Sequence, residues 1–115
     1  MKNVHEFLLD KAKQDFGILK KWTNLKLMSE TEVYENLKSL IAYHIQKMLD
    51  IQYASLLELL YKSDISEEKV RDCFHADKTS REISLELAEL YLARIQLKWK
   101  TRQEYRTKDV KGDWD

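Results

Sequence analysis

The chain has 115 residues, of which 43% are hydrophobic and 35% are charged, with no proline and only two glycines. This length suits one domain, and the scarcity of turn-forming residues excludes a many-stranded sheet. Lys plus Arg and Asp plus Glu balance at 20 each, so no overall charge directs the chain toward nucleic acid or anionic lipid. The composition therefore predicts an all-α fold, a compact bundle of four or five helices with short loops.

The single cysteine, Cys73, excludes an internal disulfide and a multi-cysteine zinc site, and it suits a reducing compartment. No apolar run has the pattern of a signal peptide, and none approaches the roughly 18 residues that a membrane span needs. We therefore expect a soluble, unprocessed cytoplasmic protein. Residues 1–111 are expected to form one helical domain, followed by a frayed C-terminal tail, 112–115.

The first helix is predicted to start at Asn3, whose side chain can cap the free amides of the first turn. Glu6 stands in the answering position of a capping box. The apolar pattern continues to about Trp22. Gly17 lies inside this pattern and disfavours helix by about 1 kcal/mol relative to alanine, so a bend or an end near Phe16 is the alternative.

After a connector, residues 23–28, Ser29 and Glu32 form a second capping box that opens the central segment. A continuous helix from Glu30 to Lys62 would span about 50 Å, more than the core of one small domain needs. We therefore expect a break near Asp50, and both two helices and one kinked helix stay open. The apolar residues keep one face at a period of 3.6: Tyr34, Leu37, Ile41, Ile45, Met48 or Leu49, Tyr53, Leu56 and Leu60.

Two further start signals follow. Ser66 is predicted to cap a short helix that begins with two glutamates, which the positive end of the helix dipole favours. Thr79 and Glu82 form a third capping box. The last helix is predicted to run from there to about Arg106.

The last helix is apolar almost all round, wider than a single packing partner requires. Such a helix either lies at the centre of the bundle or shares its surface with another chain. Its aromatic and basic residues are of the kinds enriched at protein interfaces. We therefore predict a site for a protein partner, or for a second copy of this chain, at Tyr91, Arg94, Ile95, Lys98, Trp99 and Arg102.

From Lys98 to Lys111 the chain carries six basic residues against two acidic ones, a local net charge of +4. Cations neutralise phosphates, and aromatic rings such as Trp99 and Tyr105 stack on unpaired bases. The alternative is that the cations complement the helix dipole and keep an exposed end in solution. A nucleic-acid site here would consist of Lys98, Lys100, Arg102, Arg106 and Lys108.

Candidate metal and catalytic residues are few. Asp72 and His75 stand three residues apart, a spacing at which both side chains can face one metal ion. A helical di-iron site also needs carboxylates from other helices, and Glu86 with Glu89 is the further pair available. His44 lies on the central stripe, where we expect a structural imidazole. Cys73 lacks a neighbouring basic cluster, no glycine-rich phosphate loop is present, and no cofactor is expected.

Two segments in the second half of the chain carry a resemblance: LLELLYKSDISEEKVRDCF, which begins at Leu56, and ELAELYLARIQLKWKTR, which begins at Glu86. They resemble segments of small, uncharacterised all-helical bacterial proteins that carry no known activity. The resemblance implies a structural corner formed by Tyr61, Lys62, Asp64 and Glu67, with the acids pairing with Lys62 or Arg94. It implies no functional residue.

The sequence therefore favours a small non-enzymatic protein that acts through a helical face, as an interaction or regulatory protein. A nucleic-acid-associated protein that uses the basic C-terminal helix is one alternative. A metal-dependent helical enzyme is the other.

Overall fold

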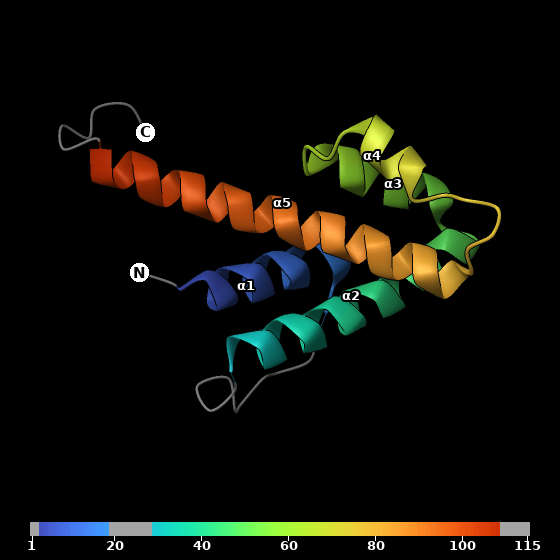
Figure 1. Cartoon of the computed structure of the whole chain (residues 1–115), viewed down its shortest axis with the longest axis horizontal. Helices are drawn as coiled ribbons and strands as arrows, with labels where there is room; N and C mark the ends of the chain where they lie inside the picture. Colours follow the sequence, from blue (N-terminus) through green and yellow to red (C-terminus); the bar gives the residue numbers. More distant parts are fainter. Residues whose placement is uncertain (1–2, 19–28, 109–115) are drawn as a thin grey trace.

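Helices make up most of the part of the chain that the computed structural model describes, residues 3–18 and 29–108, with side chains described up to Tyr105. In order they are α1 (Val4–Phe16), α2 (Glu30–Ile51), α3 (Tyr53–Lys62), α4 (Glu67–Asp72) and α5 (Ser80–Lys108). No strand occurs in these residues, which confirms the predicted all-α fold. α5 runs along the length of the molecule, and α1 and α2 pack against it on one side in Figure 1, while α3 and α4 lie on the other.

The predicted helix starts are confirmed. The Asn3 side chain accepts a hydrogen bond from the amide of the third residue of α1 at 2.9 Å, and Ser66 caps α4 in the same way at 3.2 Å. Ser29 and Glu32 form a reciprocal capping box at the start of α2, with bonds of 3.0 and 3.1 Å. Thr79 and Glu82 repeat this arrangement before α5, and the bond from the Thr79 amide lowers the pKa of Glu82.

α1 ends at Phe16, the earlier of the two ends that its sequence allowed. Gly17 follows in the left-handed conformation, with φ of 65°, and its amide donates to the carbonyl of Lys13 at 2.9 Å. Glycine adopts this conformation without the steric cost that a Cβ brings. The alternative end at Trp22 and the connector 23–28 lie outside the described residues.

The expected break in the central segment is confirmed, two residues beyond Asp50. Asp50 still belongs to α2, and Gln52 separates α2 from α3 with φ of −139° and ψ of 48°. The Gln52 amide closes the last turn of α2 on Met48, and its carbonyl accepts the first bond of α3 from Leu56. One residue with extended φ therefore turns the chain between two separate helices.

α3 ends in a Schellman motif, in which Asp64 occupies the left-handed position with φ of 67°. The Asp64 amide bonds the Tyr61 carbonyl at 3.0 Å, and the Ile65 amide bonds the Leu60 carbonyl at 3.2 Å. Ile65 and Leu60 are both buried, which supplies the hydrophobic contact of this motif. The motif turns the chain sharply from α3 toward α4.

The core is formed where α1, α2, α3 and α5 face one another. Most of the predicted central stripe lies in it, but Tyr53 is 48% exposed because α3 begins a new direction at this residue. The stripe residues with no exposed surface are Leu37, Ile41, Ile45, Leu56 and Leu60. The apolar face that the period of 3.6 predicted is therefore present, but it is divided between α2 and α3.

Tyr91 connects α5 to α1 within this core. It is fully buried, its hydroxyl donates to Oδ2 of Asp15 at 2.5 Å, and its ring meets Phe16 edge to face at 5.0 Å between centroids. Burial raises the pKa of Tyr91, and the bond to Asp15 raises it further. The phenol therefore stays protonated and acts as a permanent hydrogen-bond donor.

Candidate protein-binding surface

The C-terminal half of α5 extends past α3 and α4, as Figure 1 shows. Leu97 and Tyr105 lie in this half, and each is 51% exposed. At 3.6 residues per turn, these two residues share one side of the helix with Arg94, Lys98 and Thr101. We call these five residues the exposed α5 face, although Arg94 and Lys98 are partly covered.

The six residues predicted as a partner site do not share one surface. Tyr91 and Ile95 are fully buried in the core, so neither is accessible to a partner. The aromatic Trp99 is half-buried. Arg102 is exposed, and its guanidinium lies 5.3 Å from the ring centroid of Phe7, on the side of α5 that faces α1.

The two remaining predicted residues, Arg94 and Lys98, belong to the exposed α5 face and meet the corner between α3 and α4. Lys98 Nζ lies 3.5 Å from Oδ2 of Asp64, and Arg94 Nη2 lies 3.9 Å from the same oxygen. The implied pairing of Asp64 with Arg94 is therefore present. The second cation is Lys98, rather than Lys62 from within α3.

Leu97 and Tyr105 were not among the residues predicted for a partner site, although both are half exposed. The signal was present, because each is an apolar or aromatic residue set among cations near the end of a helix. This pattern did not distinguish the two residues from the buried ones, because apolar residues lie almost all round α5 and the same helix also buries Tyr91, Leu92 and Ile95. The side of α5 that stays exposed depends on where α3 and α4 lie in the fold, and the local sequence of α5 does not predict this.

A small groove borders the exposed α5 face, between the start of α4 and the middle of α5. It has a volume of about 160 Å³. Leu97 belongs to both the groove and the exposed α5 face, so the two are continuous. The groove is lined mainly by the apolar residues Ile65, Leu90, Ala93 and Leu97 and by the cations Lys69 and Arg94.

The cations proposed for nucleic-acid binding are spread around α5. Lys100 and Arg102 are two residues apart, which places them about 200° apart around the helix. Arg102 already lies over the Phe7 ring, and Lys98 is paired with Asp64. Arg106 and Lys108 belong to the helix, but their side chains lie outside the described part of the chain. Among the side chains described up to Tyr105, the cations of α5 form no continuous basic track for a phosphate backbone.

The metal candidates Asp72 and His75 are both exposed. Within residues 3–18 and 29–108, no three His, Cys, Asp or Glu side chains are placed to hold a metal ion. The additional carboxylates considered for such a site are engaged in ion pairs: Glu86 with Lys78, and Glu89 with Lys38 at 3.2 Å. Geometry therefore gives no support to the metal-dependent enzyme.

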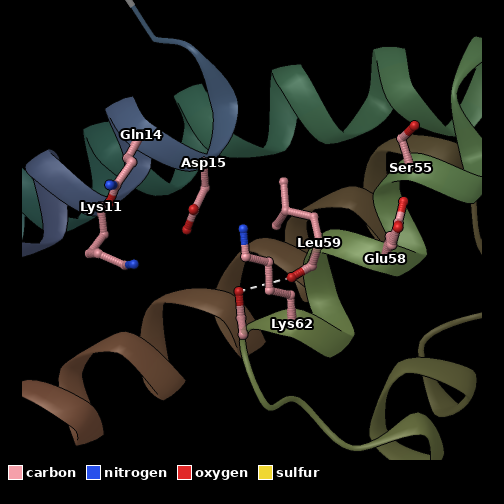
Figure 2. Close-up of a pocket in the computed structure, with 8 residues that line it drawn as sticks. Lys11, Gln14, Asp15, Ser55, Glu58, Leu59 and Lys62 are labelled. Carbon is pink, nitrogen blue, oxygen red and sulfur yellow. Dashed lines mark hydrogen bonds between the residues drawn. The ribbon is translucent and has the colours of Figure 1, made fainter.

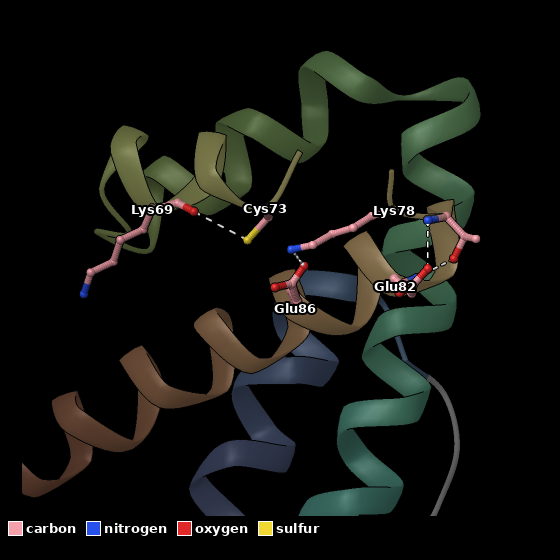
Figure 3. Close-up of polar contacts among 6 residues, drawn as sticks. Lys69, Cys73, Lys78, Glu82 and Glu86 are labelled. Carbon is pink, nitrogen blue, oxygen red and sulfur yellow. Dashed lines mark hydrogen bonds and ion pairs between the residues drawn. The ribbon is translucent and has the colours of Figure 1, made fainter. Parts of the chain in front are cut away.

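Cys73 is buried beside the ion pair of Lys78 and Glu86, as Figure 3 shows. Its thiol donates to the carbonyl of Lys69 at 3.4 Å. Burial raises the pKa of Cys73, and the nearby charge of Glu86 raises it further. The thiolate is the reactive form of cysteine, so these surroundings disfavour a nucleophile.

His44 is partly exposed on α2, where its ring meets Tyr43 edge to face at 5.7 Å between centroids. Partial burial lowers the pKa of His44, and the positive charge of Lys47 lowers it further. The imidazole is therefore neutral at pH 7. His44 is therefore not enclosed in the core, and its structural role stays a prediction.

A larger hollow of about 410 Å³ lies between α1 and α3 (Figure 2). Its lining carries charges of both signs, from Lys11, Asp15, Glu58 and Lys62. Asp15 already accepts the hydrogen bond from Tyr91. Because cations and carboxylates are mixed along an open wall, the hollow points to no particular class of ligand.

No helix in the described ranges has the length and apolar character to cross a membrane. No protein-family model, no curated protein and no solved structure matches the chain. These comparisons therefore supply no function.

Proposed function

We propose that this chain is a small non-enzymatic interaction protein of the cytoplasm that binds an acidic partner protein through the exposed α5 face. One observation carries the proposal: α5 continues past the cover of α3 and α4, with Leu97 and Tyr105 half exposed among cations. Aromatic and apolar side chains inside a charged rim are typical of protein interfaces. The reducing cytoplasm suits a buried, unpaired Cys73.

The energetics favour a charged partner. Covering the exposed half of Leu97 and of Tyr105 contributes about 1 kcal/mol each. Association costs at least about 4 kcal/mol in lost translational and rotational freedom. Apolar burial alone is therefore insufficient, and complementary charges on the partner have to contribute.

The charges of α5 favour a partner of negative charge. From Arg94 to Lys108 the helix carries six basic residues against one acidic residue, Glu104. A second copy would bring two such segments together, so like charges oppose a homodimer through this face. The positive field of these basic residues attracts an acidic protein surface. We therefore favour a different protein over self-association.

The test is fluorescence polarisation with a labelled acidic amphipathic peptide. Tyr105→Ser should weaken binding, whereas Tyr43→Ser is a matched control, because Tyr43 is also 51% exposed but lies on α2. Binding should weaken as salt is raised. Equal effects of the two substitutions would contradict the proposal. Preferential, salt-dependent binding of a labelled single-stranded oligonucleotide would instead support the nucleic-acid alternative.

A further inference from the structure

The groove beside the exposed α5 face has the size and lining to hold one apolar side chain. Its apolar residues come from two directions, Ile65 from the corner after α3, and Leu90, Ala93 and Leu97 from α5. Its volume of about 160 Å³ is close to that of a cavity that accepts benzene, about 150 Å³. One phenyl or leucyl group of a bound peptide would fill it.

Two cations stand at this groove on different helices. Lys69 is exposed on α4, and in Figure 3 its side chain extends away from Cys73. Within the described residues, its ammonium forms no ion pair. Arg94 lines the same groove from α5. The groove therefore combines an apolar lining with two positive charges.

Arg94 has unused capacity to bind an acceptor. Its Nε is buried and has no hydrogen-bond partner, and its Nη2 reaches Asp64 only at 3.9 Å. Lys98 lies closer to the same carboxylate, at 3.5 Å. A buried donor without an acceptor is unfavourable, and a guanidinium binds a carboxylate best through two parallel bonds. A small rotation of this side chain toward an incoming carboxylate would satisfy both nitrogens.

We propose that the groove recognises a peptide in which an apolar side chain stands next to a carboxylate, the apolar group entering the groove and Lys69 and Arg94 holding the carboxylate. This inference rests on the proposed function, and it names the recognition element of the acidic partner. The carboxylate comes from an Asp or Glu side chain or from the C-terminus of the partner. A nucleic acid lacks the apolar group, and a second copy of this chain would bring its own cations.

The experiment compares labelled peptides by fluorescence polarisation. The parent is an acidic peptide with an internal Phe-Asp pair, and in two controls Phe becomes Ser or the paired Asp becomes Asn. Both controls should bind about tenfold more weakly than the parent. A further pair ends in Phe with a free or an amidated C-terminus, and tighter binding of the free form identifies a terminal carboxylate as the source.

Protein variants locate the site. Lys69→Gln should weaken binding of the parent peptide several-fold, and it leaves the fold intact because this ammonium is exposed and forms no ion pair in the described structure. Lys47→Gln is the control, since Lys47 lies over the Tyr43 ring on α2. Arg94→Gln should have the larger effect, with its folding checked by circular dichroism.

The outcomes separate the two proposals. If the Phe and Ser peptides bind equally and Lys69→Gln changes nothing, but Tyr105→Ser still weakens binding, the groove inference is wrong and the proposed function stands. If none of the peptides binds the unaltered protein, both are contradicted. If the oligonucleotide displaces the peptide and binds more tightly, the groove is not a peptide site.

Discussion

Asp64 offers the sharpest test of how the corner beside α5 is held together. Its backbone lies in the left-handed region, with φ of 67°, and its carboxylate faces both Lys98 and Arg94. These two roles separate by substitution. Asp64→Asn removes the charge but keeps a residue that tolerates this conformation. Asp64→Gly removes the charge and relieves the backbone strain. Asp64→Ala removes the charge and places a residue that tolerates a positive φ poorly.

The magnitudes follow from exposure and conformation. The Asp64 side chain is 65% exposed, so its ion pairs contribute at most about 1 kcal/mol together after solvent screening. A Cβ without a compensating polar side chain costs about 1 kcal/mol in the left-handed region. We therefore expect a loss of up to about 1 kcal/mol for Asp64→Asn and about 2 kcal/mol for Asp64→Ala. Asp64→Gly should stay close to the unaltered protein, since relief of the backbone offsets the lost charge.

The assay is urea unfolding followed by tryptophan fluorescence, at low salt and at about 1 M salt, where the Debye length is about 3 Å. High salt should reduce the difference in unfolding free energy between the unaltered protein and Asp64→Asn. It should leave the difference between the Asp64→Asn and Asp64→Ala variants unchanged. Equal stability of the Asn and Ala variants would refute the conformational argument. A salt-independent gap for Asp64→Asn would refute the ion pairs.

Three further predictions concern the rest of the bundle. Ile45→Ala should cost about 2–5 kcal/mol because this side chain is fully buried, whereas Ile51→Ala on the same helix should change stability by less than about 0.5 kcal/mol, since Ile51 is 80% exposed. Tyr91→Phe should cost about 1 kcal/mol through the lost bond to Asp15. The lowered pKa of His44 means that the folded state disfavours the imidazolium, so stability should fall as pH drops below about 6.5. The His44→Gln variant should lose less stability over the same pH range.

Urea unfolding measures all of these predictions. Similar costs for the two isoleucine substitutions would contradict the described core. A Tyr91→Phe variant as stable as the unaltered protein would show that the hydroxyl bond adds nothing net. For His44, identical pH profiles of the two proteins would contradict the depressed pKa.

Local chemistry predicted much of the fold. The pairs Ser29 with Glu32 and Thr79 with Glu82 fixed two helix starts, because a capping box needs only residues three apart. The break near Asp50 was predicted to within two residues from helix length and one cap-forming residue. Asp50 remained helical because the turn needed an extended φ only at Gln52.

The candidate site was harder to predict, because it depends on contacts between distant segments. Tyr91 and Ile95 were expected at a partner surface, but α1 and α2 enclose that side of α5. Leu97 is half exposed although it lines the groove beside the corner between α3 and α4, and α5 then continues past these two helices (Figure 1). The groove needs Lys69 of α4 and Arg94 of α5 to line one hollow, and the left-handed turn at Asp64 leads the chain from α3 into α4.

Binding of an acidic partner to the exposed α5 face is tested most directly by nuclear magnetic resonance. Isotope-labelled protein would be titrated with the unlabelled acidic Phe-Asp peptide, and backbone amide shifts would be mapped along the chain. We expect the largest shifts between Arg94 and Tyr105 and at Lys69. Shifts centred on Tyr43 of α2, or no shifts at peptide concentrations of about 1 mM, where even weak complexes form, would contradict this expectation.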